Sequence, residues 1–509
     1  MSRFYVFYSF VIGCSIIAAL PLFGQETNKG IRRSADPVPG SYIVVLKPSI
    51  PAATVPDTAR TLAQLKGGRV TAVMSTAIKA FGFRGSEASA FALSRHPLVD
   101  FVEEDAFLEF SNTCSTQSSM TTCTFNNDDR WALDRIDQKP PIGSTKSFSY
   151  TLNGAGVYAY VVDTGVRGSH DELVGRVTIG ANMTVDPEIA DDIEDENEEP
   201  PIPLDYAAAN NPCGGSVESY NWDATHGTAV ASVLGGSTVG VARGVTIVPV
   251  KVASCYYDPE DHQQKTKVSM LATARGLDWV LSDVQSYQRK AVVNISLRFV
   301  LHDGFEDKDR FTCEDGAGGY TNCMAAIEHV VRSLILARIP VVVAAGNDKW
   351  HVSNDGIARM GYGGSFADAK TITVGGTMYK TEEGNADAAW VCDASRDAWG
   401  GFTKCTRNSG SNYGAAVSIW APAWNVMSAG GFDNESFRPK GIPSSGTSYA
   451  APQVAGAVAR ILQKYSYQEK TVDDIWAELS AAAVNSYTPD FDEDPNVENK
   501  KLLYASPNE

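Results

Sequence analysis

The stretch "SGTSYAAPQVAGAVARILQKY" (445–465) joins a run of small loop residues to an alanine-rich segment, and Ser448 lies at the junction. Apolar residues recur there at helical spacing and predict one buried helix face: Ala450, Ala451, Val454, Ala455, Val458 and Ile461. Proline is tolerated best in the first turn of a helix, so Pro452 predicts a helix that begins close to Ser448. A serine in this place is most often a helix cap, and only the rest of the chain can indicate another role.

Upstream of this stretch, apolar runs alternate with helix-like segments. The strand-like runs are 156–162, 245–252, 291–297, 339–346 and 371–376, and the clearest helix-like segments are 268–284 and 322–338. Strands that are apolar throughout and separated by helices predict an α/β fold, a doubly wound parallel sheet with helices on both faces. Ligands of such sheets bind at the carboxyl ends of the strands.

Two further residues that could carry chemistry occupy such positions. Asp163 follows the apolar run "GVYAYVV", and His226 begins the apolar helix-like segment "HGTAVASVLGG". Taken singly, the aspartate is typical of a turn and the histidine of a loop. Together with Ser448 they give the chain order Asp, His, Ser, which is the order of the subtilisin arrangement of a catalytic triad.

Four motifs carry a family resemblance: "VVDTGV" (161–166), "HGTAVAS" (226–232), "VVVAAGN" (341–347) and "SGTSYAAP" (445–452). Through them, nearly everything after Trp131 resembles the secreted subtilisin-like serine proteases of peptidase family S8, nearest to the proteinase K type. The resemblance implies a serine endopeptidase that works through an acyl-enzyme. Ser448 would attack the peptide carbonyl, His226 would transfer the proton and Asp163 would hold the imidazole. Asn347 would be the oxyanion donor.

The same resemblance implies residues that bind substrate. Ser296, Leu297 and Arg298 match the strand that pairs with the substrate backbone, and the wall of the pocket for the residue before the scissile bond would include Ala344, Ala345 and Gly346. Small residues leave a roomy apolar slot, so Phe, Tyr or Leu is expected there. The family has glycines where this chain has Arg298 and Phe299, and we expect Arg298 to add tolerance for an acidic residue upstream. Ala229 stands where the family often has a second histidine.

Residues 25–110 resemble the inhibitor-type propeptide of the family, with "YIVVLK" near the start and "HPLVDFVEED" near the end. The pattern predicts a small α+β domain: a strand at 41–48, a helix at 58–67, and strand, helix and strand within 82–105. "AFLEF" (106–110) is expected to be an extended tail across the active site, cut by the enzyme itself between Phe110 and Ser111. The polar segment 111–130 is the expected linker, and 111–509 the catalytic domain.

The N-terminal segment predicts export. Residues 1–24 hold a basic residue and then an apolar run that ends in small residues, which is typical of a secretory signal peptide; an uncleaved anchor is the alternative. No later segment reaches membrane-spanning length, so the processed protein is expected to be extracellular and without a membrane partner.

Cysteine usage fits an oxidising compartment. Eight cysteines remain after Cys14 leaves with the signal, and they allow 105 pairings. Proximity along the chain suggests Cys114–Cys123, Cys313–Cys323 and Cys392–Cys405, which leaves Cys213–Cys255. None of the spacings is that of a zinc site.

The charge balance excludes one class of partner. The chain has 43 Lys and Arg against 60 Asp and Glu, a formal charge of −17, whereas phosphate binding needs a basic surface. The acidic segment 186–201 is expected to be a solvated loop. It lacks the D-x-[DN]-x-[DN]-G spacing of a calcium-binding loop. Ser418 stands where a proteinase K-like calcium site has an aspartate. We therefore predict no metal ligands, leave calcium dependence open, and expect a monomer that needs no cofactor.

Two other function classes fit the sequence less well. A catalytically silent relative that only binds peptides would be expected to have lost a triad member, but all three are present. An α/β-hydrolase esterase needs G-x-S-x-G and the order Ser, acid, His; Ser448 has Ala450 two residues after it, and the order differs.

Overall fold

The structure is a computed structural model. It describes residues 30–34, 37–110, 131–137, 148–184, 225–258, 263–298, 312–314, 320–322, 325–348, 352, 356–362, 369–378, 388–389, 410–431, 434–437, 445–484 and 501–505. The predicted signal peptide, the 111–130 linker and the acidic segment 186–201 lie outside these ranges, and the four disulfide pairings stay predictions for the same reason. Within the ranges described, no helix has the length and apolar character needed to cross a membrane.

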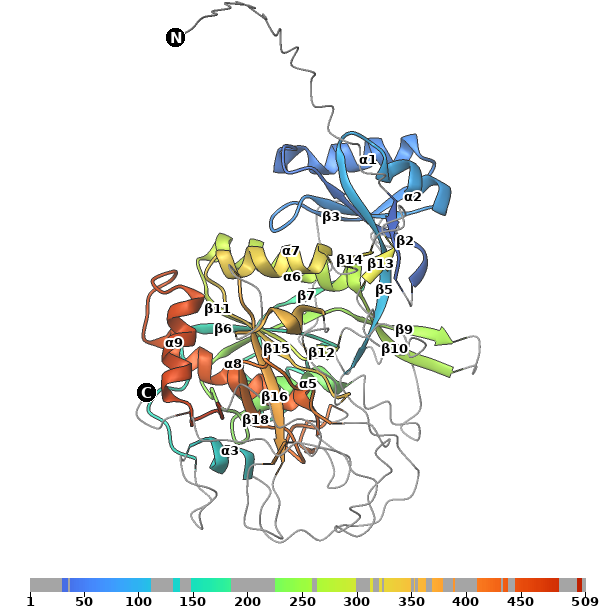
Figure 1. The fold of residues 1–509 in the computed structure, drawn as a ribbon. Coiled ribbons are helices and arrows are strands. Elements are labelled where there is room, and N and C mark those ends of the chain that lie inside the picture. Colours follow the sequence, from blue (N-terminus) through green and yellow to red (C-terminus); the bar gives the residue numbers. More distant parts are fainter. Residues whose placement is uncertain are drawn as a thin grey trace, which may run out of the picture.

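Residues 30–110 form the first unit, the upper part of Figure 1. Four antiparallel strands lie in the order β3-β4-β2-β5, and the two-residue β1 pairs in parallel with β5. The Ser86 hydroxyl caps α2 by accepting a hydrogen bond from the Ser89 N–H. The bounds are β1 Ile31–Arg32, β2 Pro37–Leu46, η1 Ala52–Thr54, α1 Val55–Leu65, β3 Arg69–Met74, β4 Ala80–Arg84, α2 Glu87–Ser94 and β5 Val99–Phe110.

The sheet of this unit is buried on both faces. In β2, Val44 and Leu46 belong to a core shared with α1 and α2, whereas Ile43 and Val45 belong to a core shared with the second unit. Because successive strand residues point to opposite faces, one short apolar run supplies both cores. The expected strands and helices of residues 41–105 are present, together with β3, which the pattern did not predict, and the first unit is packed against the second.

The second unit is built on an eight-stranded sheet with the order β17-β16-β15-β11-β6-β8-β7, and β18 also pairs with β16. Every pairing in it is parallel except that of β16 with β17. The predicted doubly wound parallel sheet is therefore confirmed. The bounds are β6 Val157–Asp163, β7 Ala181–Asn182, β8 Thr246–Lys251, β11 Lys290–Ile295, β15 Val341–Ala344, β16 Ile372–Met378, β17 Ala388–Ala389 and β18 Ile419–Pro422.

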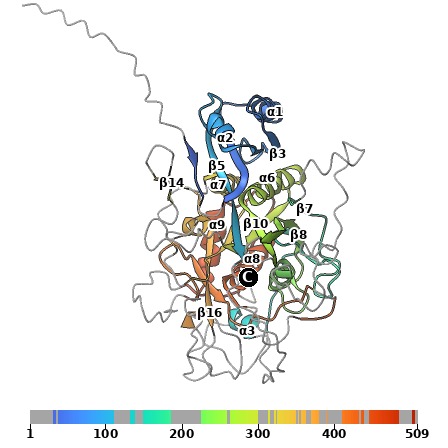
Figure 2. The ribbon, with the colours of Figure 1, turned by 90° about the vertical axis from the view of Figure 1, so that its right-hand side faces the viewer.

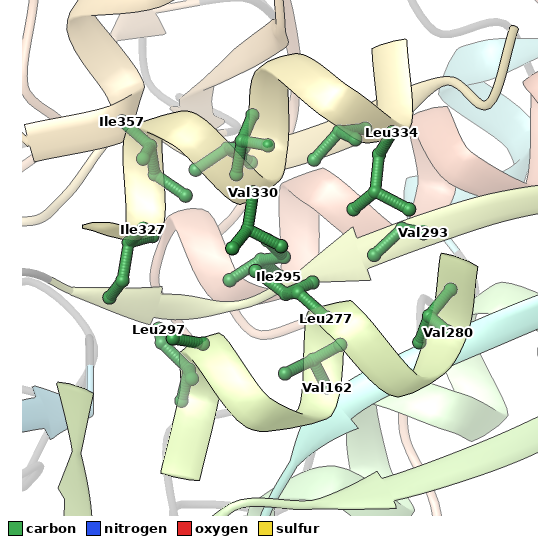
Figure 3. Close-up of a cluster of buried hydrophobic side chains, with 14 of the residues drawn as sticks. Val162, Leu277, Val280, Val293, Ile295, Leu297, Ile327, Val330, Leu334 and Ile357 are labelled. Atoms are coloured by element: carbon green, nitrogen blue, oxygen red, sulfur yellow. The ribbon is translucent and has the colours of Figure 1, made fainter. Parts of the chain in front are cut away.

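Helices cover both faces of this sheet. The cores show α6 and α7 on one face, and α5, α8 and α9 on the other. Figure 3 shows the first core, where Leu277 of α6 and Val330 of α7 meet Ile295 of β11. The helix bounds are α3 Trp131–Ile136, α5 His226–Gly235, α6 Met270–Tyr287, α7 Ala325–Leu336, η4 Gly356–Met360, α8 Thr447–Gln463 and α9 Val472–Ala482.

Strand β5 belongs to both units, and it runs from the first into the second in both ribbon views (Figures 1 and 2). Its last four residues lie between two strands of the second unit: Phe107 and Leu108 pair with Ser269 and Val268 of β10, and Glu109 and Phe110 pair with Arg298 and Leu297 of β12. "AFLEF" is thus the end of a long strand and not a separate tail, because these two neighbours supply its backbone partners. The remaining bounds are β9 Ala253–Asp258, β10 Gln263–Ser269, β12 Leu297–Arg298, β13 Thr312–Glu314 and β14 Tyr320–Asn322.

Candidate active site

Asp163 and His226 lie in direct contact at the carboxyl end of the parallel sheet. Asp163 ends β6, His226 begins α5, and both side chains are fully buried. The imidazole Nδ1 lies 2.8 Å from one carboxylate oxygen and 2.9 Å from the other. Such a contact fixes the ring plane and favours the tautomer whose Nδ1 carries the proton, which leaves Nε2 as the basic nitrogen.

Backbone contacts hold this pair in place. The Asp163 carboxylate also accepts a hydrogen bond from the Thr164 N–H (2.7 Å), and the Thr164 hydroxyl accepts one from the Gly227 N–H (2.9 Å). A Cβ on Gly227 would lie 2.3 Å from the carbonyl oxygen of Gly165, so only glycine allows the start of α5 to approach the end of β6 this closely.

Ser448 is the second residue of α8 and is buried beside the pair. Its hydroxyl donates to the carbonyl of Ser296 (3.2 Å), the residue that links β11 to β12. The ring of Tyr449, the next residue, lies edge-on to the His226 ring with their centres 6.0 Å apart, and α5 packs against α8. The structure thus brings Asp163, His226 and Ser448 to one end of the sheet, from β6, α5 and α8.

The helix α8 begins close to Ser448, as predicted, but Pro452 lies just beyond its first turn. The helix begins at Thr447, so Pro452 is its sixth residue and cannot donate to the carbonyl four residues earlier, which is that of Ser448. The Ser296 hydroxyl supplies the missing donor at 2.9 Å, and it accepts in turn from the Asn294 amide (2.9 Å). The proline is tolerated because β11 and its end provide this hydrogen bond.

Asn347 follows β15 and faces the start of α8. Its amide oxygen accepts hydrogen bonds from the backbone N–H and the hydroxyl of Thr447, both at 2.9 Å. With the oxygen held on the Thr447 side, the NH₂ group is the part of the amide that can donate elsewhere. Gly346 precedes it with a φ of +99°, a conformation that favours glycine, so the chain can turn sharply out of the strand.

The site edge favours negative charge. The N-termini of α5 and α8 lie at the same edge and carry partial positive charge. A developing oxyanion next to Ser448 would therefore lie in a favourable field.

The predicted substrate-binding residues lie in different surroundings, and what each can offer a substrate is mainly its backbone. Leu297 and Arg298 form β12 and pair with the end of β5 through their backbone. The side chains of Ala344 and Ala345 belong to the two cores on opposite faces of the sheet, so a substrate would meet only the backbone of these residues and of Gly346. The Ser296 hydroxyl is directed at Ser448, so only its backbone is left for a substrate.

Ser418, at the position of the family's calcium-binding aspartate, has a structural role. Its hydroxyl oxygen accepts hydrogen bonds from the N–H groups of Tyr362 (2.8 Å) and Thr373 (3.1 Å). Among the described residues, no three His, Cys, Asp or Glu side chains are grouped so that they could hold a metal ion.

Three contributors to the site were not singled out from the sequence. Thr164 and Thr447 flank Asp163 and Ser448 and bond to the partner segments described above. Asn412 contacts both sides of the Asn347 loop. The two threonines lie within the motifs "VVDTGV" and "SGTSYAAP", which is a usable signal, whereas Asn412 is distant in sequence from the motif "VVVAAGN" whose loop it contacts.

The comparisons with known proteins agree with this geometry. The profile of the "Subtilase family" matches residues 154–501. An "Extracellular serine proteinase" of Thermus sp. (strain Rt41A) is 31% identical over 465 residues, which cover 87% of this chain and 84% of that protein. "Subtilisin-like protease 1" of Pseudogymnoascus destructans is 28% identical, over 88% and 86% of the two chains.

A solved structure supports the fold. Fervidolysin from Fervidobacterium pennivorans, described as a keratinolytic enzyme related to subtilisin, superposes with a TM-score of 0.55 at 20% identity, over 94% of this chain and 62% of that one. Both a family profile over most of the chain and a relative of similar length lead to one assignment. The chain belongs to the subtilase family and is a serine-type endopeptidase.

Proposed function

We propose that the protein is a secreted endopeptidase that cleaves peptide bonds through an acyl-enzyme formed on Ser448. The observation that carries this is the buried contact of His226 with both carboxylate oxygens of Asp163, beside the helix start that holds Ser448. His226 Nε2 takes the hydroxyl proton as Ser448 Oγ attacks the carbonyl carbon, and gives it to the departing amine. Water then attacks the ester by the same route, and Asp163 stabilises the imidazolium throughout.

The oxyanion formed in each step is stabilised by Asn347 and by the backbone N–H of Ser448. Two hydrogen bonds from Thr447 hold the Asn347 amide oxygen, which supports a donor role for its NH₂ group. A preorganised donor of this kind is typically worth about 3 kcal/mol of transition-state stabilisation. No cofactor takes part in this chemistry.

The first unit acts as an intramolecular inhibitor. In support of this, the end of β5 is held as an antiparallel strand between β10 and β12, which is the way an extended peptide adds to a sheet. Substrates would add in the same place, so the inhibitor and the substrate exclude each other. The substrates are polypeptides in extended conformation, with Phe, Tyr or Leu before the scissile bond.

The register of β5 bears on the site of self-cleavage. Phe110, the last residue of β5, pairs with Leu297, and the adjacent Ser296 has its carbonyl oxygen 3.2 Å from the Ser448 hydroxyl oxygen. This supports cleavage within one residue of the proposed Phe110–Ser111 bond. Sequencing the N-terminus of the mature enzyme tests it: a start at residue 110, 111 or 112 agrees with the register, and a start before Asp100 contradicts it.

Export completes the proposal. Removal of residues 1–24 would release a monomer to the extracellular space, with no nucleic acid or membrane as partner. Two named relatives, the Thermus proteinase above and "Alkaline serine exoprotease A" of Vibrio alginolyticus, bear names that fit a secreted enzyme. Detection of the processed chain in the culture medium of the producing cell tests this part.

Covalent labelling tests the catalytic proposal. A fluorophosphonate probe should modify the processed enzyme at Ser448 alone, as peptide mass mapping would show. Ser448→Ala should abolish labelling, and Ser445→Ala, a nearby serine that accepts a hydrogen bond from the Asn425 N–H, should retain it. A folded wild-type protein that is not labelled would instead favour the catalytically silent relative.

A further inference from the structure

The segment that carries Asn347 has little regular structure of its own. β15 ends at Ala344, and Ala345 donates to the Val374 carbonyl (3.0 Å) before the positive-φ turn at Gly346. A donor that must meet an oxyanion within a few tenths of an ångström therefore lies in a loop. Something outside the loop has to fix its backbone.

One buried side chain spans the two sides of Asn347. The Asn412 amide NH₂ donates to the carbonyl of Ala345 (2.9 Å), and the Asn412 amide oxygen accepts from the N–H of Asp348 (2.9 Å). The backbone N–H of Asn412 also donates to the Gly346 carbonyl (2.9 Å). Asn412 is fully buried, so water does not compete for these contacts.

The neighbours of Asn412 are fixed in turn. The Gly410 N–H donates to the carbonyl of Asn347 (2.8 Å), and the Ser411 hydroxyl accepts from the N–H of Gly376 in β16 (2.9 Å). The segment 410–412 therefore joins the Asn347 loop to the central sheet.

We infer that Asn412 is a positioning residue for the reaction, which fixes the loop so that the Asn347 amide is held ready for the oxyanion. Asn412 bonds both neighbours of Asn347 and needs no contact with the substrate. No other side chain type of this size offers a donor and an acceptor on one planar group. The inference rests on the proposed role of Asn347.

A double-mutant cycle tests the inference in the processed enzyme, which is produced from the full-length chain. In the wild-type background, Asn412→Ala should lower kcat about 30-fold with KM changed less than threefold, because a misplacement of about 1 Å can cost up to 100-fold in rate. In an Asn347→Ala background the same change should cost less than threefold, because the group that Asn412 positions is gone. Equal losses in the two backgrounds would overturn the inference.

A transition-state analogue gives a second readout. A peptide boronic acid, whose tetrahedral adduct needs the oxyanion donor, should lose affinity for Asn412→Ala about as much as kcat/KM falls. A product peptide should keep its affinity within threefold. A variant that binds the boronic acid normally would contradict the inference.

Ser418→Ala is the matched control for stability. Ser418 lies in the same segment of chain as Asn412. Its replacement removes a buried acceptor from the backbone N–H groups of Tyr362 and Thr373, and neither group belongs to the Asn347 loop. It should lower the melting temperature as Asn412→Ala does and leave kcat within twofold. If Asn412→Ala does not fold, Asn412→Ser, which keeps one polar group, carries the same cycle with a smaller expected loss.

The experiment separates the two proposals. Full activity of Asn347→Ala would reject the oxyanion role itself, whatever Asn412 does. A strongly impaired Asn347→Ala together with a normal Asn412→Ala would reject only the positioning role.

Discussion

The two pairs of helices on the parallel sheet use their N-termini differently. On one face, α5 and α8 begin with His226 and with Ser448 as second residue, and neither has an acidic residue in its first turn. On the other face, the starts of α6 and α7 are met by acids of β5: Asp105 accepts from the Leu271 N–H (3.0 Å), and Glu103 accepts from the Ala326 N–H (3.1 Å).

The difference shows how one structural feature serves two purposes. A helix start offers unpaired N–H groups and partial positive charge. At α8 this favours a transient oxyanion that forms during the reaction. At α6 and α7 the helix starts donate to carboxyl groups that the first unit supplies, so release of the first unit after cleavage would leave these two helix starts exposed to water.

The largest expected effect concerns the start of α8, where the helix N-terminus serves the reaction. Ser448→Ala should lower proteolysis about 10⁶-fold, because a triad works as a unit, and it should leave an uncleaved precursor. Gel analysis of the purified variant, with no other protease present, measures the processing. Normal processing would contradict both the triad and self-cleavage.

The second prediction concerns the acidic residues of β5 at the starts of α6 and α7. It is tested in the uncleaved Ser448→Ala precursor. Burial raises the pKa of Glu103 from its ordinary value of 4.5 to about 8. A group whose pKa is raised by folding stabilises the folded state fully at pH values below its ordinary pKa. This contribution is lost as the pH rises through the raised pKa. Glu103 alone should therefore lower the stability of the precursor from pH 4.5 to about 8, by at most tenfold in the unfolding equilibrium per pH unit.

Glu103→Gln should flatten this part of the profile, as chemical denaturation at a series of pH values would show. Burial also raises the pKa of Asp105, from 3.8 to about 6, so Asp105→Asn should flatten only that lower window. Glutamine keeps the acceptor for the Ala326 N–H and is a conservative change. An unchanged profile in Glu103→Gln would show that folding does not raise the pKa of this carboxyl group.

The third prediction concerns the start of α8. Ser296→Ala should lower kcat about tenfold, because a buried carbonyl that loses its donor costs about 1–3 kcal/mol and Ser448 can then shift. Ser296→Thr, which keeps the hydroxyl, should retain most activity. Adding Pro452→Ala restores a backbone N–H for the Ser448 carbonyl, so the further loss on Ser296→Ala should shrink. Equal losses with and without the proline would reject this explanation.

The smallest expected effect concerns specificity. Arg298 pairs in register with Glu109, and opposite charges in directly facing strand positions contribute about 0.2–1 kcal/mol. Substrates with Glu as the second residue before the scissile bond, the place of Glu109 in the proposed self-cleavage, should therefore be cut about 1.4- to fivefold better than those with Gln. Arg298→Gly should remove the preference. A peptide library measures both ratios. A profile that is the same at every upstream position in the two enzymes would remove Arg298 from the recognition of substrate.

Much of the fold followed from local patterns. Apolar runs such as 291–297 and 339–346 were expected as strands of a parallel sheet, and both are central strands, because continuous apolar character requires burial on two faces. The apolar runs beside Asp163, His226 and Ser448 placed these candidate residues at a strand end and at two helix starts. The α+β character of residues 41–105 followed from the same patterns.

Contacts between distant segments were decided only by the tertiary structure. The sequence marked Pro452 as a constraint on the helix start, but the donor that makes it tolerable comes from Ser296, at the end of another strand. It ended the propeptide-like strand near Asp105, whereas β5 continues because β10 and β12 offer it partners. Local spacing determines whether a residue can lie in a helix or strand; which backbone group lacks a partner, and which distant side chain supplies one, depends on how the elements pack.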